Sequence, residues 1–222
     1  MSKSNRDSWT KFRRTTLFSG PPVKGWSIAV YDEQMAEVLN RYARPSTVKV
    51  IVEYGSGDGV WAEYLTRKHP LKEIWGYEWN HTLINLANQR CKGLKKVGFV
   101  EADVSEHVHA GCDLFFAFGV IEHFSNHVAV LSKWVSTLRR GGACILNAPN
   151  LDNLEWILSR TTLKLPDIQG KEWVVTDTYG YEEIWSPKYF VSVIERAGLK
   201  LLEHWVVDRW HEHAQVAVCV KI

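Results

Sequence analysis

The hydrophobic positions of the chain follow two alternating spacings. Runs of consecutive apolar, often β-branched residues are typical of buried strands, and they occur at residues 48–54, 73–78, 97–102, 113–119, 143–148, 199–207 and 214–220. Apolar residues that recur every three or four positions are typical of helices, and they occur around residues 31–42, 60–65, 83–87, 128–138 and 187–197. This alternation predicts an α/β fold with a mostly parallel sheet and helices on both faces.

Local signals fix the ends of several elements. Only six residues separate the last two strands, so they must pair as a hairpin, and the seven-stranded sheet contains one antiparallel strand. Asn80 is a suitable N-cap, and Ser186 followed by Pro187 is a typical helix start. We expect the helix that begins near residue 128 to end at residues 139–142, Arg-Arg-Gly-Gly, with a glycine as its left-handed cap.

Two segments lack this regular alternation. Residues 1–27 show no clear periodicity and predict an irregular N-terminal arm on a single domain that spans residues 1–222. Residues 149–185 are too long for an ordinary connection, so we expect an insertion that caps the domain. Its aromatic residues either form the floor of this cap over an acceptor, or attach the insertion to the domain, or form a homodimer contact. These residues are Trp156, Trp173, Tyr179, Tyr181 and Trp185.

Composition excludes several classes of protein. Apolar residues make up 45% and charged residues 23%, as in ordinary globular proteins and unlike disordered chains. No stretch approaches the roughly 20 apolar residues of a membrane span, and the N-terminus lacks the apolar core of a signal peptide. The four cysteines form no CxxC pair, so we expect a cytoplasmic protein. A net charge of +2 does not predict a nucleic-acid partner, although residues 1–24 hold six basic residues and one acid.

The strongest chemical signal is residues 53–59, Glu-Tyr-Gly-Ser-Gly-Asp-Gly, which lie between the first strand and a helix. Glycines let the backbone turn sharply and approach a ligand, and the helix N-terminus favours a carboxylate or phosphate there. An acid directly before the glycines would repel a pyrophosphate but attract an ammonium group. The GxGxG spacing therefore counts against a nicotinamide oxidoreductase, whose GxGxxG motif has its acid about 20 residues later. The residues expected at the ligand are Glu53, Gly55, Ser56, Gly57 and Gly59.

This turn resembles motif I of the class I S-adenosylmethionine (SAM) methyltransferases, which have a Rossmann-like fold. The resemblance implies that SAM is the cofactor. Glu78 ends the second strand, 19 residues after Gly59, and matches the family acid that accepts hydrogen bonds from the ribose hydroxyls. The other residues that the resemblance places at the cofactor are Trp79 against the adenosine, Asp103 and Val104 beside the adenine ring, and Phe118 and Gly119 beneath the sulfonium.

Residues 119–124, Gly-Val-Ile-Glu-His-Phe, resemble the segment after strand four in the small-molecule branch of that family. This branch includes ubiquinone-type O-methyltransferases and many sugar and natural-product methyltransferases, so the resemblance implies methyl transfer to an oxygen or nitrogen of a small molecule. His123 is the candidate general base, because a histidine can accept a proton near neutral pH. Alignment of the reactants can also carry methyl transfer, in which case His123 is structural.

The sequence also bears on metals and on other functions. Metal-dependent relatives have a matching acid after strand five, where this chain has Asn147 and Asn150, so we expect no metal site. Methyl transfer to RNA or protein is an alternative that only the basic arm supports. A non-catalytic partner subunit with a SAM fold is another, although the intact glycine motif and the acids Glu78 and Asp103 count against it.

Overall fold

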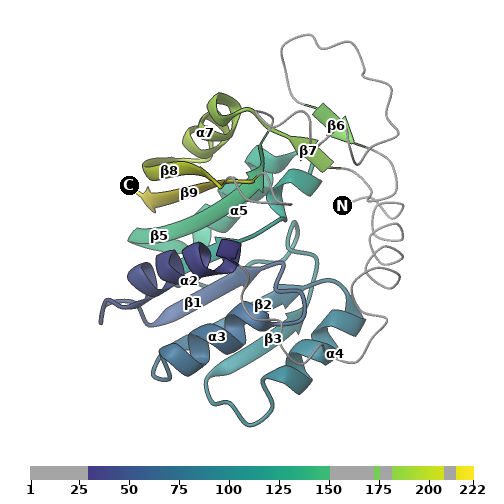
Figure 1. Cartoon of the computed structure of the whole chain (residues 1–222), viewed down its shortest axis with the longest axis vertical. Coiled ribbons are helices and arrows are strands. Elements are labelled where there is room, and N and C mark those ends of the chain that lie inside the picture. The colour runs from purple at the N-terminus through teal and green to yellow at the C-terminus, as the bar shows by residue number, and fades with distance from the viewer. Residues whose placement is uncertain (1–29, 151–172, 176–181, 208–213) are drawn as a thin grey trace.

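The computed structural model describes residues 30–150, 173–175, 182–207 and 214–222 (Figure 1). The predicted arm therefore lies outside the described residues, as does most of the predicted cap insertion. Within the described ranges, the predicted α/β fold is confirmed. Seven strands form one sheet in the order β3-β2-β1-β4-β5-β9-β8.

The strands pair as the sequence predicts. Neighbouring strands from β3 to β5 are parallel, and β9 runs antiparallel to both β5 and β8. Their bounds are β1 (Val50–Tyr54), β2 (Glu73–Glu78), β3 (Val97–Glu101), β4 (Cys112–Ala117), β5 (Leu138–Pro149), β8 (Leu199–Val207) and β9 (Ala214–Lys221).

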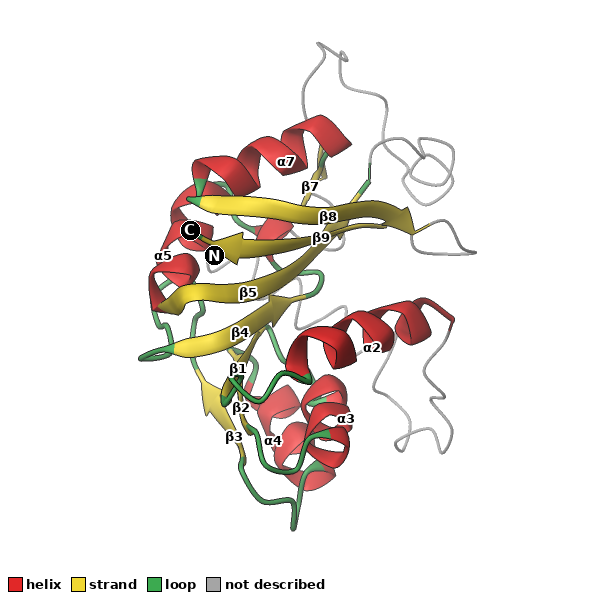
Figure 2. Cartoon of the chain, turned by 90° about the vertical axis from the view of Figure 1, so that its left-hand side faces the viewer, coloured by secondary structure: helices red, strands yellow, loops and turns green. Residues whose placement is uncertain are grey.

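Helices cover both faces of the sheet. In Figure 2, α2, α3 and α4 lie on one face and α5 and α7 on the other. Their bounds are α2 (Val30–Ala43), α3 (Val60–Lys68), α4 (His81–Arg90), α5 (His127–Thr137) and α7 (Pro187–Arg196). Both predicted caps are present, because Asn80 accepts from the amides of the first turn of α4 and Ser186 accepts from the amide of Tyr189.

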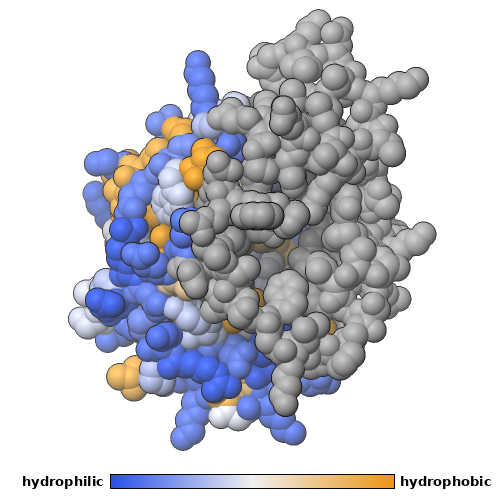
Figure 3. Space-filling view, viewed as in Figure 1, coloured by the Kyte–Doolittle hydropathy of each residue, from blue (hydrophilic) through white to orange (hydrophobic). Residues whose placement is uncertain are grey.

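Each face of the sheet has its own hydrophobic core. The core beneath α5 and α7 contains Phe115, Trp134 and Phe190, and the core beneath α2 and α3 contains Leu39 and Leu65. All four cysteines are buried. The described surface that faces the viewer in Figure 3 is mostly hydrophilic, as expected when apolar side chains are enclosed between sheet and helices.

The end of α5 differs from the sequence prediction. The helix stops at Thr137, and Leu138 is already an extended residue of β5 that lies opposite Cys112 of β4. The predicted glycine cap is therefore wrong, and the glycines lie instead in an irregular stretch of β5. A Cβ atom on Gly142 would lie 2.9 Å from the carbonyl oxygen of Asp113, so close strand pairing requires glycine there.

The described part of the insertion contains two short strands that the sequence did not reveal, β6 (Trp173–Val175) and β7 (Glu182–Ile184), paired antiparallel. Trp185 follows them and is fully buried. The side-chain amide of Gln215 donates to the carbonyl oxygens of both Trp185 and Pro149, at 2.8 and 3.3 Å. Trp185 thus attaches the insertion to the domain, one of the three roles considered for its aromatic residues. The residues outside the described ranges are Trp156, Tyr179 and Tyr181.

Candidate active site

A cleft lies at the carboxyl ends of β1, β2, β3 and β4. In this sheet β2 lies on one side of β1 and β4 on the other, so the chain changes direction at β1. Ligands of open α/β sheets bind at such a switch point, because loops from both directions diverge there. The lining residues are Gly55, Gly57, Glu78, Trp79, Asp103, Val104, Phe118, Gly119, Val120, His123 and Phe124.

The glycine-rich turn forms one wall of the cleft. Gly55, Gly57 and Gly59 all have positive φ angles, which non-glycine residues rarely adopt. A Cβ atom on Gly55 would lie 2.3 Å from the side chain of Val120, and one on Gly59 would lie 2.8 Å from the ring of Phe99. Around Gly57, by contrast, no described atom lies within 4 Å of that position. Gly55 and Gly59 thus permit packing within the protein, whereas Gly57 leaves room for a ligand.

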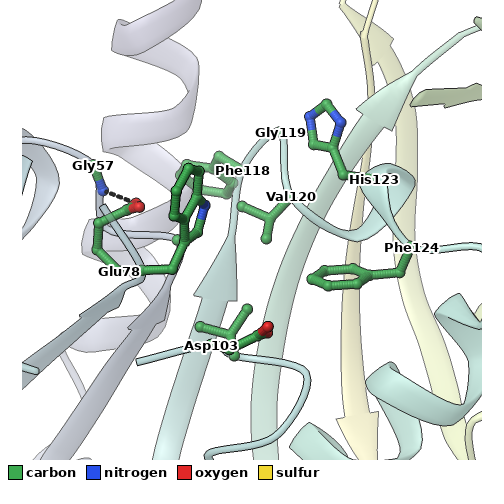
Figure 4. Close-up of a pocket in the computed structure, with 11 residues that line it drawn as sticks. Gly57, Glu78, Asp103, Phe118, Gly119, Val120, His123 and Phe124 are labelled. Carbon is green, nitrogen blue, oxygen red and sulfur yellow. Dashed lines mark hydrogen bonds between the residues drawn. The ribbon is translucent and has the colours of Figure 1, made fainter. Parts of the chain in front are cut away.

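Glu78 ends β2 beside this turn and is almost fully buried, with 4% of its surface exposed. Its Oε2 accepts a hydrogen bond from the amide of Gly57 at 3.1 Å, and its Oε1 accepts one from the amide of Asn80 at 2.9 Å. These two amides fix the orientation of the carboxylate at the edge of the cleft, and Figure 4 shows the hydrogen bond from Gly57. A carboxylate oxygen can accept more than one hydrogen bond, so Glu78 is also able to receive hydroxyl groups of a ligand.

Hydrogen bonds also fix the wall that follows β3. Oδ1 of Asp103 accepts from the amide and the hydroxyl of Ser105, at 2.9 and 2.7 Å. The carbonyl oxygen of Val104 accepts from the indole nitrogen of Trp134 at 2.8 Å. A turn held in this way presents its remaining polar groups in one orientation, which suits recognition of a flat, polar ring.

The loop after β4 forms the floor. The ring of Phe118 lies 5.8 Å from that of Trp61 in an edge-on arrangement, so the aromatic floor is held by α3. Gly119 has a φ of +66°, and its amide donates to Oδ1 of Asn147 at 2.6 Å. Asn147 therefore fixes the start of residues 119–124.

The side of the cleft opposite Glu78 is built from residues 119–124, which include a short 3₁₀ helix, η1 (Ile121–His123). His123 is 7% exposed and lines the cleft together with Val120 and Phe124. Figure 4 shows Glu78 on one side and His123 and Phe124 on the other. Sequence reasoning missed Val120 and Phe124 as lining residues, although both belong to the segment that it had identified.

Three predicted residues, Glu53, Ser56 and Gly59, do not line the cleft. Glu53 is 4% exposed, and its Oε2 has no hydrogen-bond partner among the described residues. Burial, with smaller contributions from Asp58 and Glu78, raises the pKa of Glu53 well above its usual value, and a hydrogen bond to the backbone of Ala62 opposes this. Glu53 thus lies behind the glycine turn as a buried acid that favours its neutral form.

Nowhere in the described ranges do three His, Cys, Asp or Glu side chains gather closely enough to hold a metal ion. Among the described helices, none is long and apolar enough to span a membrane.

The amino-acid sequence matches known proteins over much of its length. A family model described as "Methyltransferase domain" matches residues 29–204. Among curated proteins, the chain is similar to trans-aconitate 2-methyltransferases. It is 29% identical to that of Afipia carboxidovorans over 121 residues, which are 54% of this chain and 46% of the relative. It is 30% identical to one from Rhodopseudomonas palustris, over 50% of this chain and 43% of the relative. The alignments thus span about half the length of these relatives.

Solved structures show the same fold at low sequence identity. The 1,6-didemethyltoxoflavin-N1-methyltransferase of Burkholderia thailandensis, with its acceptor and S-adenosylhomocysteine (SAH) bound, superposes with a TM-score of 0.72. The identity is 14%, and 98% of this chain and 85% of that one are covered. The N-methyltransferase NodS of Bradyrhizobium japonicum, with SAH bound, gives a TM-score of 0.68 at 13% identity, covering 96% and 98%.

Proposed function

The chain belongs to the methyltransferase domain family, and from that premise we propose that it transfers the methyl group of SAM to an oxygen or nitrogen atom of a small molecule. One observation carries the proposal. The carboxylate of Glu78 is held by the amide of Gly57 at the edge of a cleft that the glycine turn leaves open. In this arrangement the two carboxylate oxygens of Glu78 can accept hydrogen bonds from the two hydroxyls of a ribose. The glycine turn, which has few side chains, leaves space for the charged amino-acid group of the same ligand.

The residues around the cleft fit SAM in three respects. Glu78 would hold the ribose, and the indole of Trp79 would cover the adenosine. Asp103 and Val104, at the far end, would recognise the adenine ring. Behind the turn, Glu53 favours its neutral form, and a cation bound at the turn would shift that acid toward its ionised form.

When bound, SAM supplies an electrophilic methyl group on a sulfonium whose leaving group is a neutral thioether. The contribution of the protein is therefore mainly to orient the acceptor and to exclude water. Residues 119–124 lie opposite Glu78 and would hold the acceptor. His123 is the side chain of this wall that could accept the proton of an acceptor hydroxyl.

The lining of the cleft favours a small organic acceptor. Its apolar and aromatic lining residues are Trp79, Phe118, Val120 and Phe124. No lysine or arginine is among the described lining residues. Methyl transfer to RNA has less support than transfer to a small acceptor, as the proteins similar to this chain indicate. The relatives that resemble this chain act on trans-aconitate and on a toxoflavin precursor, both small molecules.

Calorimetry with SAM, SAH and NAD tests the cofactor. We expect SAM and SAH to bind at about one site per chain and NAD to give no heat. Binding of NAD without SAM would contradict the proposal. A screen for SAH formation with trans-aconitate, hydroxylated aromatic compounds and heteroaromatic amines then tests the acceptor class. Methylation of RNA or protein with no turnover of any small molecule would favour the alternative.

A further inference from the structure

A buried histidine lies directly behind the acceptor side of the cleft. His127 opens α5, three residues after Phe124, and its ring is almost fully buried. Its Nδ1 lies 3.1 Å from the carbonyl oxygen of Phe124, within hydrogen-bond distance. The backbone of a residue that lines the cleft is therefore bound to a side chain that does not line it.

His127 has partners on two elements distant in the sequence. On one side, Oε2 of Glu183 in β7 lies 3.4 Å from Nδ1 of His127, and the same oxygen accepts from the indole nitrogen of Trp185 at 2.8 Å. On the other side, the hydroxyl of Tyr189 in α7 lies 2.9 Å from Nε2 of His127. The ring is thus held at both nitrogens and also lies 4.8 Å from the ring of Trp185.

Residues 119–124 have little regular structure of their own. The 3₁₀ turn is only three residues long, and its two backbone hydrogen bonds, from the amides of His123 and Phe124, are long at 3.2 and 3.3 Å. Such a short turn is a weak structure in isolation, so its conformation depends on tertiary contacts. Asn147 fixes its beginning through Gly119, and His127 fixes its end through Phe124.

The carboxylate of Glu183 is buried and lies between His127 and Trp185. An ionisable side chain that is 4% exposed costs free energy unless it is held by partners. Oε2 of Glu183 lies 3.4 Å from Nδ1 of His127 and accepts from the indole of Trp185, and the backbone of Trp185 is in turn fixed to β9 through Gln215. The acid therefore connects β9, through Trp185, to the imidazole that holds Phe124.

We propose that Glu183 and His127 are positioning residues that hold residues 119–124 in the orientation in which His123 and Phe124 face the acceptor. Neither residue lines the cleft, so both act through the backbone of Phe124. The role in catalysis rests on the proposed methyltransferase function, whereas the positioning of the segment can be measured without it.

The test compares Glu183→Gln with Glu195→Gln in the full chain. Glu195 is an exposed residue of α7, so its variant is a matched control for loss of one acid. We expect both variants to unfold cooperatively and to bind SAH with wild-type affinity. In Glu183→Gln alone, amide exchange within residues 119–124 should be about tenfold faster, because that segment opens more readily.

A spectroscopic signal separates positioning from a merely structural role. The ring resonance of His123, assigned by its loss in His123→Asn, should shift or broaden in Glu183→Gln and remain unchanged in Glu195→Gln. Normal exchange in residues 119–124 with an unchanged His123 resonance in folded Glu183→Gln would overturn the proposal. Absence of SAH binding to the wild type would instead contradict the proposed function and leave the exchange comparison valid.

A second variant keeps the proposal testable should Glu183→Gln not fold. Tyr189→Phe removes only the hydroxyl that faces Nε2 of His127. We expect it to accelerate exchange in residues 119–124 severalfold and to alter the His123 resonance in the same direction, with SAH affinity unchanged. Wild-type exchange and an unaltered resonance in this variant would also overturn the proposal.

Discussion

Glu78 accepts a hydrogen bond from the amide of Gly57 at 3.1 Å, which joins the end of β2 to the glycine turn that follows β1. The two features that the sequence suggests separately, a GxGxG motif and an acid 19 residues after it, are thus one structural unit. A second hydrogen bond, from the amide of Asn80, leaves the carboxylate little freedom. A ligand that binds this carboxylate meets a preorganised acceptor, which lowers the entropic cost of binding.

Glu78→Gln should weaken SAM binding at least tenfold while the fold survives. A hydrogen bond to a charged group contributes roughly 1.5–3 kcal/mol, and the amide removes both the charge and one of the two acceptors. Calorimetry gives the affinity, and a thermal melt checks the fold. The control is Glu101→Gln, which removes an exposed acid at the position of β3 that pairs with Glu78 in register. Equal loss of affinity in both variants would show that Glu78 has no special role.

Gly57→Ala and Gly59→Ala should have different effects on binding and stability. Both glycines have left-handed backbone angles, which cost a non-glycine residue roughly 1–2 kcal/mol. Alanine at 57 meets no described atom within 4 Å, so its main effect should be to fill the ligand space and weaken SAM binding at least tenfold. Alanine at 59 would collide with Phe99 and Ala87 and should lower the free energy of unfolding by a further ~1–3 kcal/mol.

Denaturant unfolding and SAM calorimetry on both variants test this contrast. A Gly57→Ala protein with wild-type SAM affinity would show that the open space beside Gly57 is not part of the binding site. Similar losses of stability in the two variants would contradict the distinction between packing and ligand space.

Glu53→Gln should stabilise the protein at high pH. Burial raises the pKa of Glu53 in the folded state well above its usual value, so the folded protein retains this proton after the unfolded chain has lost it. The free energy of unfolding therefore falls as pH rises from the usual glutamate range through the raised value. Glutamine stays neutral and removes this loss. We expect similar melting temperatures for the two proteins near pH 4, and a melting temperature a few degrees higher for the variant near pH 8. A variant less stable than the wild type near pH 8 would show that the Glu53 charge is stabilised in the fold.

The sequence predicted most of the fold because the strands that form its centre are buried on both faces. Such strands appear as continuous apolar runs, as in residues 113–119. The predicted end of α5 was wrong. Arg139 and Gly141 suit a helix end locally, but the pairing of Leu138 with β4 ends the helix before them. The strands β6 and β7 are three residues each, too short to give a periodic signal.

The candidate site was predictable where one segment supplies several of its residues. The glycine turn and residues 119–124 are contiguous in sequence, so their chemistry is visible as a motif. The contact between His127 and Glu183 was not predictable, because 55 residues separate the two and only the folded chain brings them together. Glu53 matched a motif, but its distance from the cleft depends on which face of β1 it occupies.

His123 distinguishes two mechanisms, and its position on the cleft wall makes the distinction measurable. If His123 is a general base, His123→Ala should reduce turnover about 10²–10⁴-fold. The affinity for SAM should stay intact, because the side chain of His123 lies on the opposite side of the cleft from Glu78. The loss should shrink at high pH, where an acceptor hydroxyl ionises without help. If His123 only shapes the segment, His123→Asn should keep most of the activity, since an amide can replace one hydrogen bond of the imidazole. We expect a base, because His123 is the one titratable side chain among the described lining residues on the acceptor side. Turnover of His123→Asn equal to that of the wild type between about pH 6 and 9 would establish alignment of the acceptor as the main source of catalysis.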